Sequence, residues 1–148
     1  MYKHILIPTD GSALSNEALV RSLQLAKTFG AAVTILTVEE PFHVFSMGSA
    51  QLAASLNDYQ DQVRSQAERL LNEAAAQARE LGLSCETLRV SHEDPYQAII
   101  DASAKRGCDL IAMASHGRRG MAAVVLGSQT QKVLTHSTTP VLVYRKQS

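Results

Sequence analysis

The chain has 148 residues, about the length of one domain, with 45% hydrophobic and 19% charged residues, values typical of a globular protein with a buried core. Its 14 Lys and Arg residues balance 14 Asp and Glu residues, whereas dedicated nucleic-acid binders carry a basic excess. No apolar run approaches the roughly 18 residues of a membrane span, and polar turn residues come too early for a secretory signal. We expect a single cytoplasmic domain, residues 1–148, with neither nucleic acid nor a membrane as its partner.

The first part of the chain alternates between strand-like and helix-like patterns. Residues 5–7 form a short apolar run that ends in the turn residues 8–12. Helical spacing follows over residues 15–29, and Gly30 occupies the position of a helix C-cap glycine. Residues 32–38 are rich in β-branched side chains and predict a second strand.

The clearest helical pattern covers residues 52–81, after a stretch without any period at 41–50. Its apolar residues recur at the α-helical period of about 3.6 rather than the 3.5 of a coiled coil, which predicts a helix lying on a sheet. Gly82 ends this helix. The apolar stripe consists of Leu52, Leu56, Tyr59, Val63, Ala67, Leu70, Ala74, Ala78 and Leu81.

The remaining elements continue the alternation. Residues 84–90 predict a less apolar strand at a sheet edge, and 110–114 a fully buried strand. Between them, Asp94 is the expected N-cap of a helix that begins with Pro95 and reaches about residue 106. Residues 128–131 repeat the capping-box pattern for a last helix ending near residue 136, and 141–144 predict a final strand.

This order of elements, β-α-β-α-β-α-β-α-β, predicts an α/β fold with a single doubly wound, Rossmann-like sheet. We expect five parallel strands in the order 3-2-1-4-5, with helices on both faces. Ligands of such sheets bind at the carboxyl ends of the strands, where the strand order reverses. Two loops of the sequence are suited to that place.

The first of these loops follows the buried fourth strand. It contains Ala114-Ser-His-Gly117 and, after residues 118–126, Gly127-Ser128 at the start of a helix. Glycines allow close approach of the backbone to a ligand and positive φ angles, and the amides of Ser128, Gln129 and Thr130 lack partners within the helix. With the helix dipole they form an anion site suited to phosphate, to which the Ser128 and Thr130 hydroxyls can add hydrogen bonds. The alternative is that the glycines only shape a loop and Ser128 only caps a helix.

At these residues the sequence resembles the universal stress protein family. Its nucleotide-binding members carry Gly-x-x-Gly, nine residues, then Gly-Ser or Gly-Thr, a pattern matched by Gly117, Gly127 and Ser128, with Ala114 as a departure at the first position. The likeness spans the chain, from the opening Ile-Leu-Ile-Pro-Thr-Asp-Gly-Ser to the closing Thr-Pro-Val-Leu-Val-Tyr. The resemblance implies that the domain binds ATP, with Mg²⁺ arriving on the phosphates.

The second loop follows the first strand. Asp10 is suited to accept from an adenine amino group or to lie near a metal ion, and the alternative is a turn residue or helix cap. The resemblance implies that Pro8, Thr9 and Asp10 line the nucleotide pocket, that Val38 meets adenine through its backbone, and that Met113 forms an apolar wall. The alternative for Met113 is a core residue.

Ala114 stands where the family pattern has glycine, and its effect on ligand affinity depends on the backbone conformation. If this position requires a positive φ, the Cβ costs roughly 1–2 kcal/mol, which weakens binding about tenfold. If its backbone is extended, the alanine has no such cost.

Other candidate groups carry weaker signals. Arg118 and Arg119 either screen phosphate charge or are simply solvated, and the apolar stretch 121–126 is expected to pack over the pocket or into an oligomer contact. His116 lies in the loop, where backbone shape is the stronger constraint, and His43 has no evident partner. Three adjacent residues, 92–94, converge poorly on a metal, so we expect no metal site built from protein side chains.

Three functions compete. The first is an ATP-binding stress-response regulator, or sensor, whose nucleotide occupancy changes its contacts with an unknown regulatory protein. The second is a slow ATP hydrolase of the same fold, although no catalytic residues can be assigned and no P-loop or nucleophile elbow is present. The third is a nucleotide-free interaction protein. By resemblance, Val141–Tyr144 pairs with its own copy to form a homodimer.

Overall fold

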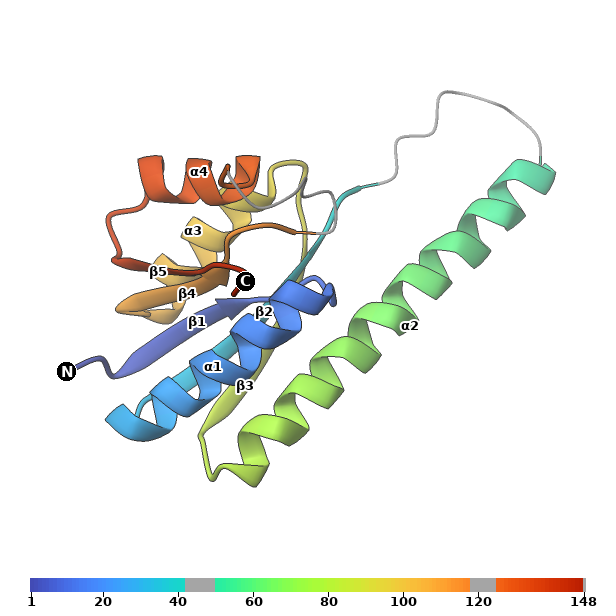
Figure 1. The fold of residues 1–148 in the computed structure, drawn as a ribbon. Helices are drawn as coiled ribbons and strands as arrows, with labels where there is room; N and C mark the ends of the chain where they lie inside the picture. The colour runs from blue at the N-terminus through green and yellow to red at the C-terminus, as the bar shows by residue number, and fades with distance from the viewer. Residues whose placement is uncertain (42–49, 118–124, 148) are drawn as a thin grey trace.

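A computed structural model of the chain describes residues 1–41, 50–117 and 125–147. One parallel sheet runs through the molecule in the order β3-β2-β1-β4-β5, as predicted (Figure 1). Among the described helices, none is both long and apolar enough for a membrane span. The elements in chain order are β1 (His4–Pro8), α1 (Ala13–Phe29), β2 (Ala32–Glu39), α2 (Ala50–Glu80), β3 (Cys85–Ser91), α3 (Pro95–Arg106), β4 (Leu110–Ala114), α4 (Ser128–His136) and β5 (Val141–Tyr144).

The helices cover the sheet in two pairs (Figure 1). On one face α1 and α2 pack on a core that includes Ile5, Ile7 and Ile35. On the other face α3 and α4 pack on Leu6, Leu36 and their neighbours. Successive residues of β1 thus point into opposite cores. All three of its central residues, Ile5, Leu6 and Ile7, are fully buried. The continuous apolar run of β4 is buried at all five positions because helices cover both faces of the sheet.

The predicted element boundaries agree closely with the structure. The strands β4 and β5 begin and end where expected, and β3 lies at a sheet edge as predicted. The helix predicted from residue 15 begins at Ala13, with Ser12 as its N-cap. Gly30 and Gly107 end α1 and α3 in the left-handed conformation, with φ of 65° and 66°, because only glycine adopts it without a steric cost.

The long helix α2 only partly lies on the sheet, and this corrects the prediction. Its carboxy-terminal half buries Leu71, Ala74 and Ala78 against the first core. The amino-terminal half extends beyond the sheet edge (Figure 1), where Leu52 is 43% and Tyr59 49% exposed. The apolar period is continuous along the helix, but the sheet surface beneath it is shorter than the helix.

Both predicted capping boxes are wrong at the level of side chains. Asp94 is the N-cap of α3 but makes no side-chain cap bond, and Gln97 donates instead to Asp101 Oδ1 at 2.9 Å. At α4 the N-cap is Gly127, so Ser128 is the first helical residue. At α3 the Tyr96 amide finds its acceptor in Gln129 of α4 instead, and at α4 no side-chain cap bond forms.

Candidate functional site

The two candidate loops meet at the carboxyl ends of β1 and β4, which are neighbours in the sheet. The chain leaves β1 toward α1 on one face and leaves β4 toward α4 on the other face (Figure 1). This is the point where the strand order reverses, and the crevice at such a point is the usual ligand site of the fold.

The turn after β1 is held by short polar contacts. Thr9 is 5% exposed, and its hydroxyl lies 2.8 Å from the Ser15 hydroxyl. The Asp10 amide donates to Ser15 Oγ at 3.1 Å, and Asp10 Oδ1 accepts from the Ser12 amide at 2.9 Å. Gly11 completes the turn with a φ of 80°. The fixed turn presents Asp10 at the end of the strand.

Gly117 lies directly against Asp10. A Cβ at position 117 would stand 2.7 Å from Asp10 Oδ2, closer than such atoms approach. The structure therefore brings the two loops into contact, as the doubly wound fold predicts. The φ of Gly117 is not in the left-handed range, so this position favours glycine through the close approach alone, and a Cβ would require the Asp10 carboxylate to move.

Gly127 is packed in the same way. Its φ is −59°, so of the two properties that favour glycine in this loop, close approach applies here and a positive φ does not. A Cβ there would lie 3.0 Å from the Ser115 carbonyl oxygen and 3.4 Å from His116 Cα. The Gly127 amide donates to Ser115 O at 2.8 Å. The helix α4 thus begins in contact with the end of β4.

The first turn of α4 has backbone amides without an acceptor among the described residues. Within the described part of the chain, no group accepts from the amides of Ser128, Gln129 and Thr130, as expected for the first turn of a helix. Ser128 is exposed. Free amides and the positive end of the helix dipole make this turn able to bind an anion.

Two side chains of this turn have roles that the sequence did not indicate. The Thr130 hydroxyl is buried and donates to Ala114 O at 3.0 Å and Ser115 O at 3.2 Å. It therefore does not face a ligand, contrary to the expectation that it contacts phosphate. Gln129 Oε1 accepts from the Tyr96 amide at 2.9 Å and so supplies the cap that Asp94 does not. Both contacts join residues far apart in the sequence, which no local pattern reveals.

The remaining candidates lie around this crevice at different depths. Pro8 ends β1, and Val38 lies near the end of β2, half-buried against the second core. Met113 is 6% exposed and packs within that core, as its alternative assignment predicted. Ala114 is the last residue of β4 and pairs with Tyr144. Its backbone is therefore extended, and the alanine carries no left-handed strain.

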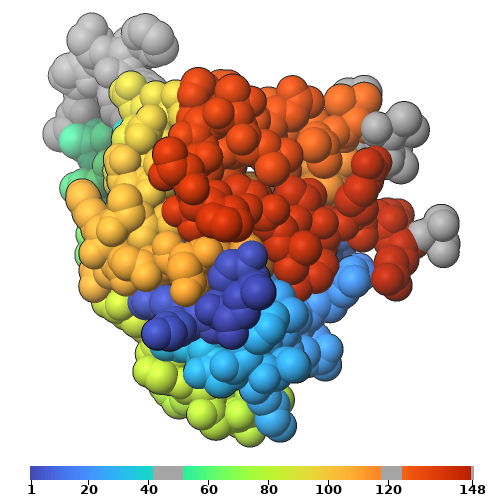
Figure 2. Space-filling view, turned by 90° about the vertical axis from the view of Figure 1, so that its left-hand side faces the viewer, coloured from blue at the N-terminus to red at the C-terminus, as the bar shows by residue number. Residues whose placement is uncertain are grey.

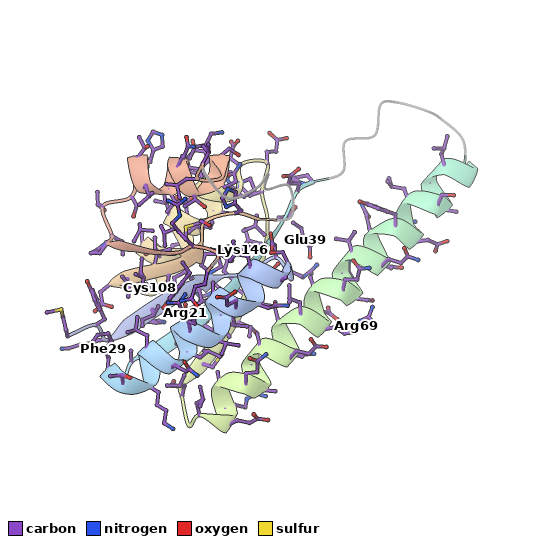
Figure 3. The ribbon with its side chains drawn as sticks, in the orientation of Figure 1. Arg21, Phe29, Glu39, Arg69, Cys108 and Lys146 are labelled. Carbon is purple, nitrogen blue, oxygen red and sulfur yellow. The ribbon has the colours of Figure 1, made fainter. Side chains whose placement is uncertain are left out.

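No nucleophile or metal cluster emerges from the described residues. Among them, no three His, Cys, Asp or Glu side chains gather around a point that could hold a metal ion. Burial raises the pKa of Cys108 (labelled in Figure 3) to about 11, and burial also raises the pKa of Cys85. Both thiols are therefore protonated at neutral pH and poorly nucleophilic.

Two histidines, His92 and His116, bond to neighbouring residues of their own loops. His116 Nδ1 lies 3.0 Å from Ser115 Oγ, and His92 Nδ1 accepts from the Asp94 amide at 2.8 Å. Val125 is 65% exposed and so does not pack over the pocket, and the alternative of an oligomer contact stays a prediction. The other predictions for this loop and for the stretch after β2 lie outside the described residues: Arg118, Arg119, residues 121–124, His43 and residues 42–49.

Comparison with known proteins gives consistent results. The model of the "Universal stress protein family" matches residues 1–145. The chain is 32% identical to Universal stress protein MJ0531 of Methanocaldococcus jannaschii, over 99% of this chain and 84% of that protein. It is 30% identical to Universal stress protein YxiE of Bacillus subtilis, over 98% of this chain and the whole of that protein.

Solved structures share the fold. The structure of MJ0577 from Methanocaldococcus jannaschii superposes with a TM-score of 0.79 at 26% identity, covering 100% of this chain and 99% of that one. A universal stress protein solved in complex with cAMP has a TM-score of 0.72 at 24% identity, covering 99% and 98%. One from Archaeoglobus fulgidus, solved with dAMP, has a TM-score of 0.66 at 18% identity, covering 96% and 97%.

Proposed function

Because the chain belongs to the universal stress protein family, we propose that it is a regulator that binds an adenine nucleotide, ATP with Mg²⁺, in the crevice between β1 and β4. Nucleotide occupancy would then change its contacts with a regulatory protein partner in the cytoplasm. The observation that carries the proposal is the first turn of α4, whose amides have no acceptor among the described residues, beside the close-packed Gly117 and Gly127.

The phosphates belong at α4 on electrostatic grounds. The amides of Ser128, Gln129 and Thr130 donate to anionic oxygens, and the exposed Ser128 hydroxyl adds a donor beside them. A helix terminus supplies only about 0.3–1 kcal/mol per anionic contact, and about 2 kcal/mol when partly buried. Micromolar affinity requires about 8 kcal/mol. Contacts to adenine and ribose must therefore supply most of the affinity.

The other end of the crevice suits the nucleoside. Asp10 carries a negative charge against Gly117 and would repel a phosphate placed beside it. Its carboxylate instead favours a hydrogen-bond donor, such as the adenine amino group or a ribose hydroxyl, or a bound Mg²⁺. Pro8, Thr9 and the backbone of Val38 complete this end of the proposed pocket. Ala114 ends β4 at this crevice, whereas Met113 packs in the second core on the face covered by α3 and α4.

The bound ligands of the solved neighbours agree with this chemistry. One neighbour is in complex with cAMP and another with dAMP. At 24% and 18% identity these likenesses establish the fold alone. Adenine nucleotide binding therefore comes to this chain as a proposal, supported by its own loop.

A homodimer through β5 is part of the proposal. This strand lies at the edge of the sheet, and Leu142 on it is 36% exposed. The carboxy-terminal residues, drawn in red, lie on the surface in Figure 2. An exposed apolar edge strand pairs readily with another strand, and a second copy of β5 would cover it.

Titration tests the nucleotide proposal. We expect the protein to bind ATP with micromolar affinity and inorganic triphosphate far more weakly, because the triphosphate lacks the nucleoside contacts. Gly127→Val should abolish ATP binding, since its Cβ would press on the backbone oxygen of Ser115 at 3.0 Å. Thermal melting of the variant checks that it still folds. Equal affinity for ATP in the two proteins would overturn the assignment of the site.

A further inference from the structure

We propose that Thr130 is a positioning residue of the phosphate site: its buried hydroxyl fixes the direction of the free amides in the first turn of α4 and does not itself touch the ligand. The inference rests on the proposed nucleotide binding at that turn. It reverses the role that the sequence suggests for this hydroxyl, which is direct contact with phosphate or metal.

The first turn of α4 is fastened to the end of β4 at both of its ends. One carbonyl, that of Ser115, accepts from the Gly127 amide at 2.8 Å and from the Thr130 hydroxyl at 3.2 Å. The same hydroxyl lies 3.0 Å from Ala114 O. Ser115 and Thr130 are 1% and 3% exposed, so these bonds are shielded from water. The helix start can therefore neither lift nor rotate without breaking buried hydrogen bonds.

The opposite side of the turn is held by Gln129. Its Oε1 accepts from the Tyr96 amide in the first turn of α3. Thr130 and Gln129 are consecutive residues, so their side chains leave the helix in different directions, one toward the sheet and one toward α3. Their bonds restrain the turn from two sides, while the three amides have no acceptor among the described residues. An anion gains most from donors already aligned, because no ordering cost is incurred on binding.

The test compares two ligands. Adenosine lacks phosphate, so a change in the direction of the amides weakens ATP binding and leaves adenosine binding unchanged. General damage to the domain weakens both. We expect Thr130→Val to lower ATP affinity about tenfold, the effect of losing roughly 1.4 kcal/mol of aligned contacts, with adenosine affinity changed less than about twofold. Thr130→Ser restores the hydroxyl and should recover most of the ATP affinity.

A matched control lies on the same helix. Thr135 also donates through its hydroxyl, to Gln131 O at 2.8 Å, but it is exposed and this bond stays within α4. Thr135→Val makes the same chemical change and should leave both affinities unchanged. ATP and adenosine are titrated by protein NMR shifts, which register millimolar as well as micromolar binding, and melting temperatures are measured alongside.

Each outcome decides the inference. If Thr130→Val lowers both affinities together, or neither, Thr130 is not a positioning residue. If Thr130→Val does not fold, Gln129→Met tests the same turn, and an unchanged ratio of ATP to adenosine affinity there overturns the inference. Failure of the unmodified protein to bind either ligand contradicts the proposed function itself, which separates the two failures.

Discussion

At Gly117 and Gly127 the backbone lies so close to neighbouring atoms that a side chain would displace them. The neighbour of Gly117 is the Asp10 carboxylate, and that of Gly127 is the backbone oxygen of Ser115. A carboxylate can rotate away, whereas a strand backbone yields less readily. The two glycines therefore differ in how much a Cβ perturbs the site, although the sequence pattern presents them as equivalent.

Ala114 offers a sharper test at the residue scale. Since it ends β4 in extended geometry and is 8% exposed, Ala114→Gly relieves no strain. We expect ATP affinity within about twofold of the original and a loss of stability of about 0.5–1 kcal/mol, the cost of glycine in a strand. Titration and urea unfolding measure the two quantities. A tenfold gain in affinity would show instead that the Cβ of Ala114 obstructs the pocket.

At the scale of elements, α2 divides into two halves with different surroundings. Ala67, Leu71, Ala74, Ala75 and Ala78 are buried, all in the carboxy-terminal half. The stripe that precedes them extends past the sheet, where Leu52 is 43% and Tyr59 49% exposed. Stability within this helix should therefore be uneven.

A pair of substitutions tests this division. Leu71 is 6% exposed in the first core, and Leu52 is 43% exposed on the same helix. We expect Leu71→Ala to lower the free energy of unfolding by about 2–5 kcal/mol, and Leu52→Ala to lower it by about 0.5 kcal/mol or less. Urea unfolding of both variants measures the difference. Equal losses would mean that another surface covers the amino-terminal half of α2 in solution.

The elements themselves could be predicted from local patterns, because periodicity and C-cap glycines act over a few residues. The acceptors of the first-turn amides in α3 and α4 could not be predicted in this way, because they depend on contacts across the fold. Gln129 caps α3 from another helix, and the Thr130 hydroxyl faces the sheet. The crevice was predictable from the alternation of strands and helices, whereas the contact between Gly117 and Asp10 required the three-dimensional structure.

At the scale of the whole molecule, the sheet leaves two edges, β3 and β5. The exposed residues of β3 include Glu86 and Arg89, which form ion pairs with Arg106 and Glu39. Charged side chains of this kind oppose pairing with another strand. β5 presents Leu142 instead, while Tyr144 is buried beneath the Arg21 guanidinium, which is 4.6 Å from the ring centre (Figure 3 labels Arg21).

This asymmetry predicts a dimer through β5. We expect light scattering at micromolar concentration to give twice the chain mass, and Leu142→Asp to give a monomer, because the substitution places a charge in the proposed interface. The control is Leu52→Asp, which changes another partly exposed leucine that lies on α2 rather than on β5. It should remain a dimer. A monomeric unmodified protein would contradict the proposed assembly.

We propose that the crevice between β1 and β4 holds an adenine nucleotide. The most direct measurement is to denature freshly purified protein, identify any released nucleotide by chromatography, and titrate the stripped protein with ATP. We expect ATP at roughly one per chain, or micromolar ATP binding by the stripped protein. An empty protein that does not respond to millimolar ATP would contradict it.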